Sequence, residues 1–206
     1  MGLAVANYTD ANGHFPPAYT LGPDKKPWHS WRVLILPYIE QNGLFESYRF
    51  NEPWNGPNNS QLAFRIPKTL VFHDTKLPTT TTNYLAVVGT NTMWPGTKGR
   101  KREEIKDDTS QTILIAENNG LGVHWMEPRD LTFDTMDFRV DTPEGVSSWY
   151  KKPGVVTTEG SILRLSKETT PEALRAALTV NGGETIARDA ENWTVIPDGR
   201  ARERKE

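Results

Sequence analysis

The feature that most restricts the fold of this chain is an apolar segment at residues 31–39, which follows Ser30, a favourable helix N-cap. Residues 31, 34, 35, 38 and 39 fall on one face of a helix, and Val33 and Leu36 are apolar as well. A short helix that is apolar on all sides is normally buried. Pro37 should kink or break it, and Asn42-Gly43 is expected to end it. The segment therefore predicts the nucleus of a core and no chemistry.

Other segments have clear local signals. A helix is expected over residues 2–12, ended by Asn12-Gly13, and another after Thr170, with Pro171 at its first position. Residues 111–116 are continuously apolar after Thr112, which predicts a strand buried on both faces. The remaining expected strands are residues 70–72, residues 83–89, and a hairpin of residues 154–158 with 161–165 around a two-residue turn at Glu159-Gly160.

Composition excludes several classes of protein. The 206 residues include 24 basic and 26 acidic side chains, which argues against a broad nucleic-acid-binding face. The absence of cysteine excludes disulfides and thiolate metal sites, and no window approaches 18 apolar residues. We expect a single globular domain at residues 1–190 and a charged, flexible tail at residues 191–206.

Candidate chemistry is sparse, and we expect no catalytic residue and no cofactor. His124, Glu127 and Asp130 have metal-ligand types at a spacing of three, but Pro128 disfavours a helix there, so hydrogen-bonded loop residues are the favoured alternative. His73-Asp74 has no identifiable nucleophile beside it. Glu117, at the end of a buried strand, is either an acid with a shifted pKa or, as we favour, a carboxylate satisfied by loop amides.

Several tryptophans lie in loops or next to them. If Trp54, Trp94 and Trp125 were exposed, they could bind a ligand by stacking on sugar rings or on a protein partner. If they are buried under the long loops, they are satellite core. Trp28 is open to the same two interpretations.

A string of phrases, in this order, resembles a known family. The phrases are Leu3 to Tyr8, Asp10 to Ala18, Ser30 to Gln41, Glu52 to Asn59, Asp107 to Glu117, Trp125 to Leu131, and Leu174 to Thr179 with Asn181 to Glu184. Together they resemble a large bacterial family, abundant in planctomycetes, of type IV pilin-like proteins that carry a domain of unknown function (fifteen fifty-nine). Members are similar to the G-type pseudopilins of general secretion.

The resemblance implies an α+β, pilin-like fold: an N-terminal helix and a central helix packed on a mostly antiparallel sheet, with long loops. Residues 2–12 would be the lower end of a pilin helix whose membrane half is missing here. It further implies a non-enzymatic protein of the cell envelope, anchored in the membrane only through that missing helix, with an extracytoplasmic domain. Its partners would be other pilin-like subunits or envelope proteins, in assembly or binding.

The chain departs from the family pattern at two places. Trp149 and Glu159-Gly160 stand where members often have a His and an Asp-Gly, and Phe72-His73-Asp74 stands near the place of a Cys-Pro-Ser. Two alternatives to the pilin-like role stay open at this point. One is a glycan-binding module built on the loop tryptophans, and the other is a hydrolase that uses Glu117 or the His124 cluster.

Overall fold

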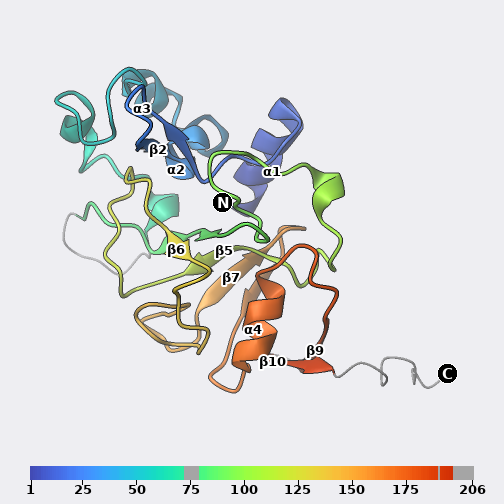
Figure 1. Ribbon diagram of the computed structural model, residues 1–206. Helices are drawn as coiled ribbons and strands as arrows, with labels where there is room; N and C mark the ends of the chain where they lie inside the picture. Colours follow the sequence, from blue (N-terminus) through green and yellow to red (C-terminus); the bar gives the residue numbers. More distant parts are fainter. Residues whose placement is uncertain (72–78, 190, 197–206) are drawn as a thin grey trace.

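A four-stranded antiparallel sheet forms the middle layer of the fold. The computed structural model describes residues 1–71, 79–189 and 191–196. The strand order is β3 (Tyr84–Leu85), β5 (Ile113–Glu117), β7 (Gly154–Thr157) and β8 (Ile162–Arg164). Helices α1 (Gly2–Asn12) and α4 (Pro171–Ala177) lie on opposite sides of this sheet (Figure 1). The architecture is therefore α+β, as expected.

Alternation along the strands explains the two layers. In β7, Val155 packs into a core that it shares with α4, and its neighbour Val156 packs into a second core that it shares with α1. Successive side chains of a strand point to opposite faces, so one apolar run can serve both cores. All five residues of β5 are buried, which confirms the predicted strand.

The predicted central helix is broken as expected, but at different residues. Helix α2 (Trp31–Leu34) ends before Pro37, which lies in the first turn of the 3₁₀ helix η1 (Leu36–Ile39). Glu40 ends that turn with φ of 60°. Asn42-Gly43 does not end the helix but begins α3 (Asn42–Ser47), because the left-handed residue at position 40 has already reversed the chain.

The burial predicted for this segment is confirmed in part: residues 31–33, 35 and 36 are buried, and residues 34 and 37–39 are half-buried. Trp31 and Ile35 join the core between α1 and the sheet, whereas Val33 and Leu36 join a third core under α3. Because the segment lies between two cores, apolar residues occur on more than one of its faces, which explains its unusual pattern.

The other elements are short. They are β1 (Tyr19–Leu21) paired with β2 (Pro27–Ser30), β4 (Val87–Val88) paired in parallel with β6 (Leu131–Thr132), and the 3₁₀ helices η2 (Asn59–Leu62), η3 (Lys68–Leu70) and η4 (Arg102–Glu104). The strand predicted at residues 70–72 is wrong at Leu70, which belongs to η3, and Phe72 lies outside the described residues. The strand predicted at residues 83–89 is split into β3 and β4, which pair with different strands.

The predicted end of α1, start of α4 and β7–β8 hairpin are confirmed, with one change in the length of the hairpin loop. Gly13 ends α1 in a left-handed conformation, with φ of 75°, and the Thr170 side chain accepts a hydrogen bond from the N–H of Ala173. The β7–β8 hairpin is confirmed, but its loop has three residues. The N–H of Thr157 bonds to the carbonyl of Ser161 at 2.9 Å, and Gly160 takes φ of 97°.

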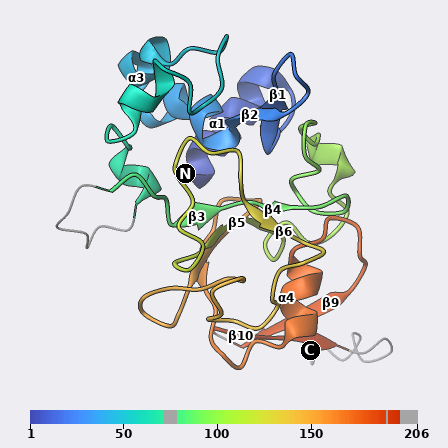
Figure 2. The ribbon, with the colours of Figure 1, turned by 60° about the vertical axis from the view of Figure 1, so that its left-hand side comes forward.

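The predicted boundary at residue 190 is wrong, because regular structure continues to Ile196. Strands β9 (Thr185–Asp189) and β10 (Asn192–Ile196) form an antiparallel hairpin beside α4, at the end of the fold away from α1 (Figure 2). Trp193 is fully buried in the α4 core. Trp193, together with the half-buried Val195, attaches this segment to the core, and the charged residues that follow concealed this in the sequence. Residues 197–206 lie outside the described residues.

None of the helices in the described ranges combines the length and apolarity needed to cross a bilayer.

The burial of Trp193 predicts a large effect on stability. Trp193→Ala should lower the free energy of unfolding by about 3–5 kcal/mol, because it leaves a cavity under α4. Trp193→Phe should cost less than about 1.5 kcal/mol, since it keeps most of the volume and removes an indole N–H that has no partner in the described structure. Denaturant unfolding measures both. Trp149→Ala, at a side chain that is 70% exposed, is the control; equal effects at positions 193 and 149 would contradict the assignment.

Candidate functional site

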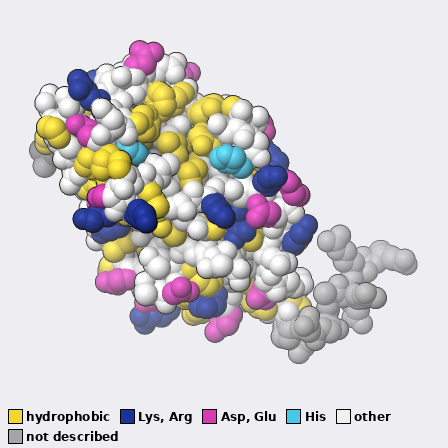
Figure 3. Space-filling model, turned by 45° about the horizontal axis from the view of Figure 1, so that its top comes forward, with side chains coloured by type: hydrophobic (Ala, Val, Ile, Leu, Met, Phe, Trp, Pro, Cys, Tyr) yellow, Lys and Arg dark blue, Asp and Glu magenta, His cyan; other side chains and the backbone are white. Residues whose placement is uncertain are grey.

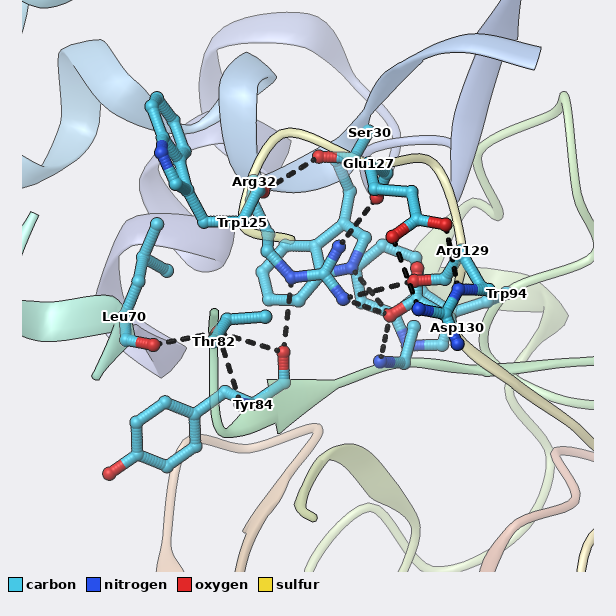
Figure 4. Close-up of polar contacts among 12 residues, drawn as sticks. Ser30, Arg32, Leu70, Thr82, Tyr84, Trp94, Trp125, Glu127, Arg129 and Asp130 are labelled. Atoms are coloured by element: carbon cyan, nitrogen blue, oxygen red, sulfur yellow. Dashed lines mark hydrogen bonds and ion pairs between the residues drawn. The ribbon is translucent and has the colours of Figure 1, made fainter. Parts of the chain in front are cut away.

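The polar centre of the molecule is a buried ion pair between Arg32 of α2 and Asp130 of the loop before β6. Figure 4 shows the polar contacts of the Arg32 guanidinium, and both side chains are at most 2% exposed. The Arg32 guanidinium donates a hydrogen bond to Asp130 Oδ1. The same oxygen accepts from the N–H of Ala86 at 2.8 Å and from Trp31 Nε1 at 3.3 Å. Sequence reasoning missed Arg32, since a charge within an apolar run gives no sign of its partner.

Three further donors of Arg32 bind backbone carbonyls. Nε donates to the carbonyl of Tyr84 at 3.1 Å, and the two terminal nitrogens reach those of Glu127 and Arg129 at 3.4 and 3.5 Å. One guanidinium therefore joins α2, β3 and the 127–130 loop. Four of its five N–H groups are bonded and its side chain is fully buried, so Arg32 is a structural clamp that a substrate cannot reach.

Burial and ion pairing shift the pKa values of Arg32 and Asp130 in opposite directions. Burial raises the pKa of Asp130 to about 6, against the opposing effects of Arg32 and of the N–H donors of Ala86 and Trp31. Burial likewise lowers the pKa of Arg32, although Asp130 raises it. At neutral pH the aspartate is charged and the pair is intact.

The three predicted metal candidates do not come together. Asp130 forms an ion pair with Arg32. Glu127 accepts two hydrogen bonds from the Arg129 guanidinium, at 2.7 and 3.2 Å. His124 Nδ1 accepts from the N–H of Met126 at 3.2 Å. In the part of the chain that the structure describes, no three His, Cys, Asp or Glu side chains are grouped so that they could hold a metal ion. The alternative of hydrogen-bonded loop residues fits the geometry.

The predicted tryptophan surface is wrong for two of its three members. Trp94 and Trp125 are buried, and their indole N–H groups donate to the carbonyls of Leu114 and Ala63 at 2.6 and 2.9 Å. A ring enclosed in a core cannot stack on a sugar. Trp54 is half-buried, with its ring 5.0 Å from that of His124. The satellite-core interpretation therefore holds for Trp94 and Trp125. Trp28 is half-buried as well and lies against Gly22.

Glu117 is a satisfied carboxylate, as we favoured. One oxygen accepts from Ser148 Oγ at 2.6 Å and the other from the N–H of Gly154 at 2.8 Å. Arg164 lies 3.6 Å away and balances the charge. His73 and Asp74 lie outside the described residues.

A groove that sequence reasoning missed opens beside Glu117. Its volume is about 400 Å³, and it is lined by the amino end of α1 and by the sheet face of β7 and β8. Leu3 and Ile162 stand at the groove with 75% and 76% of their surface exposed. The sequence offered one sign of this groove, an isoleucine two residues before Arg164 on the same side of a short predicted strand. The sequence does not show that this strand lies at the edge of the sheet, which follows from the order in which the strands pair.

The outer surface carries charges of both signs. On the face that Figure 3 shows, basic and acidic side chains are interspersed around apolar patches, with no field of one sign. This distribution agrees with the near-neutral composition.

Comparison with known proteins gives one match. Residues 1–79 match a family model described as "Protein of unknown function (DUF1559)". This is the domain of unknown function that the sequence phrases indicated, and the match spans the segment from α1 to η3. The description names no activity. No curated protein matches the chain, and no solved structure matches it.

A second buried titratable group lies near the clamp. The His29 ring is buried between aromatic side chains, with Nδ1 2.8 Å from the hydroxyl of Tyr48 and the ring of Phe50 5.1 Å away. Burial lowers the pKa of His29, and a hydrogen bond with the backbone of Phe50 opposes this. Burial also raises the pKa of Tyr48, so both groups are neutral at pH 7.

The clamp predicts an asymmetric response to mutation. Asp130→Ala should lower the free energy of unfolding by about 3–5 kcal/mol, because Arg32 is left charged, buried and unpaired. Glu127→Ala removes a carboxylate from the exposed Arg129 and should cost less than about 1 kcal/mol. Denaturant titration at pH 7 compares the two. Similar costs would mean that the Arg32–Asp130 pair is not a structural centre.

His29 predicts a dependence of stability on pH. The unfolded chain binds this proton near pH 6.5 and the folded protein binds it less readily, so acidification through pH 6.5 should lower the free energy of unfolding. His29→Gln should show a shallower loss between about pH 7 and pH 5. Asp130, with its raised pKa, contributes the opposite slope to both proteins and cancels in the comparison. Equal slopes would contradict the prediction.

Proposed function

We propose that this chain forms the globular part of a pilin-like protein of the cell envelope, with a role in assembly or binding and not in catalysis. The observation that carries the proposal is the way α1 sits on the sheet. Ala4 and Val5 pack into the core with Val156, whereas Leu3 projects outward beside the groove. The helix is thus attached by one face and offers an apolar side chain on another, as an assembling N-terminal helix requires.

The fate of the candidate acids and bases supports a non-enzymatic role. Asp130, Glu117 and Glu127 each pair with an arginine, and His124 accepts a hydrogen bond from the backbone. A catalytic group must reach a substrate atom, and the three carboxylates are instead bonded to arginines of the protein itself.

Family resemblance supports the location and the partners. The match of residues 1–79 agrees with the string of phrases shared with pilin-like proteins. In this proposal the described structure lies outside the cytoplasm, a helix that precedes α1 anchors it in the membrane, and its partners are other pilin-like subunits or envelope proteins.

Fractionation of the native host tests the proposal. The protein, expressed from its own gene with a C-terminal tag, should sediment with membranes or with sheared filaments, and detergent should release it from membranes. Protease added to intact cells should cleave it once the outer layers are permeable. Full-length protein found free in the cytoplasm would overturn the proposal.

A matched pair of α1 variants tests the role of the exposed helix face. Leu3→Glu should reduce the sedimenting assembly several-fold, since it places a charge on the apolar contact surface. Asn7→Glu adds the same charge one turn further along the exposed face and should leave assembly unchanged. Equal behaviour of the two variants would remove Leu3 from the assembly surface.

A further inference from the structure

The turn at residues 148–154, which leads into β7, is held at both ends by one buried carboxylate. Glu117 is 2% exposed and accepts a hydrogen bond from Ser148 Oγ at 2.6 Å and another from the N–H of Gly154 at 2.8 Å. Between these two points the N–H of Lys151 bonds to the carbonyl of Ser148 at 3.1 Å, and Lys151 takes φ of 58°. A left-handed conformation is costly for lysine and persists only where the surroundings fix it, so this turn has one defined shape.

The turn presents two adjacent aromatic side chains to the solvent. Trp149 is 70% exposed and Tyr150 is 56% exposed. Neither ring belongs to any of the three hydrophobic cores of the described residues. Because hydrogen bonds to Glu117 already hold the turn, packing of the rings is not needed to form it. Exposed aromatic side chains on a fixed turn are typical of a binding surface.

Tyr150 lines an open pocket of about 420 Å³ together with Lys152, Arg164 and Glu191. Lys152 Nζ lies 2.6 Å from Glu191 Oε2, and Arg164 Nη1 donates to the carbonyl of Lys152 at 3.0 Å. Within the described chain, Glu191 Oε1 and the Nε and Nη2 groups of Arg164 have no hydrogen-bond partner. The pocket therefore combines an aromatic face with both hydrogen-bond donors and acceptors.

The charges at this pocket balance. Lys152 pairs with Glu191, and Arg164 lies 3.6 Å from Glu117. The remaining cation of the turn, Lys151, does not line the pocket. A phosphate, a carboxylate or an anionic membrane is attracted by an excess of positive charge, which this pocket lacks. A neutral sugar fits better, because its C–H face can cover an aromatic ring while its hydroxyls both donate and accept hydrogen bonds.

We propose that the pocket at Tyr150 is a binding site for a neutral oligosaccharide. One sugar ring stacks on Tyr150, and its hydroxyls bond to Arg164 and Glu191. Trp149 contacts the next sugar unit, since the Cα atoms of neighbouring residues are only about 3.8 Å apart. The fixed turn lowers the entropic cost of binding, because the rings are positioned before the ligand arrives. This inference rests on the proposed role in binding, to which it adds a class of ligand, and it uses none of the three tryptophans first considered from the sequence.

Titration of the ¹⁵N-labelled chain with cellohexaose and with chitohexaose, two neutral oligosaccharides, tests the site through amide chemical shifts. At least one of them should bind with a dissociation constant on the order of 1 mM or below, a modest affinity because an open pocket buries little ligand surface. The shifted amides should cluster at residues 148–154, 164 and 191.

Matched variants test the role of the rings. Tyr150→Ala and Trp149→Ala should each raise the dissociation constant by about fivefold or more, whereas Tyr150→Phe keeps the ring and should stay within about twofold of the wild type. Phe64→Ser, at a side chain 72% exposed in another part of the molecule, should change nothing. Because both rings are exposed, the alanine variants should unfold at the same denaturant concentration as the wild type, which separates loss of binding from loss of folding.

Three results would overturn the proposal. The first is the absence of shifts with both oligosaccharides up to about 10 mM. The second is binding that Tyr150→Ala and Trp149→Ala leave unchanged. The third is binding of polygalacturonate or of phosphatidylglycerol vesicles with no binding of either neutral sugar, since charge would then select the ligand. The envelope role is tested separately, because cell fractionation can fail while the purified chain still binds sugar, and the reverse.

Discussion

The fold depends on the contact between Arg32 and Asp130, which ties together segments 98 positions apart. Asp130 accepts a hydrogen bond from the N–H of Ala86, between β3 and β4, and Arg32 donates one to the carbonyl of Tyr84 in β3. The broken course of residues 83–89 follows from these two bonds, since the chain is held by side chains where a continuous strand would pair with its neighbour. A buried pair of this kind adds little net stability over an apolar substitute, but losing one partner is costly. Its effect is therefore to specify one arrangement of the loops.

The clamp also explains how a short, interrupted helix can be central to the structure. Helix α2 has four residues and makes no side-chain cap bond, so it would not be stable alone. Its stability comes from position: Trp31 and Ile35 fill the core beneath α1, and Val33 and Leu36 fill the core beneath α3. Arg32 lies between these two apolar sets, where the only polar surroundings are those that the 127–130 loop supplies. Adjacent residues of this segment therefore lie in three different environments: the core beneath α1, the core beneath α3 and the buried ion pair.

Much of the local structure could be predicted from the sequence. Periodicity and cap residues located α1, β5, the β7–β8 hairpin and α4, because each depends on side chains within a few positions. The candidate site could not be predicted in the same way. The environment of Trp94 depends on Leu114 and that of Trp125 on Ala63, and neither contact leaves a local pattern. The boundary at residue 190 failed because the contacts of Trp193 and Val195 with the α4 core are made by a segment that precedes a strongly charged tail. Long-range contacts decide burial, and the local pattern of a single sequence does not reveal them.

Strand β8, at one edge of the main sheet, is the part of the sheet that these packing layers leave uncovered. The clamp and the two cores keep the middle of the molecule rigid on the α1 side, and α4 with the β9–β10 hairpin covers the other face. Among the described residues, the outward backbone groups of Ile162 and Arg164 on β8 have no partner, and after Arg164 the chain turns away to meet the β9–β10 hairpin at Ser166. An apolar residue kept at such an edge costs solubility and adds nothing to the core of a monomer. Packing within the subunit therefore does not explain why Ile162 is apolar.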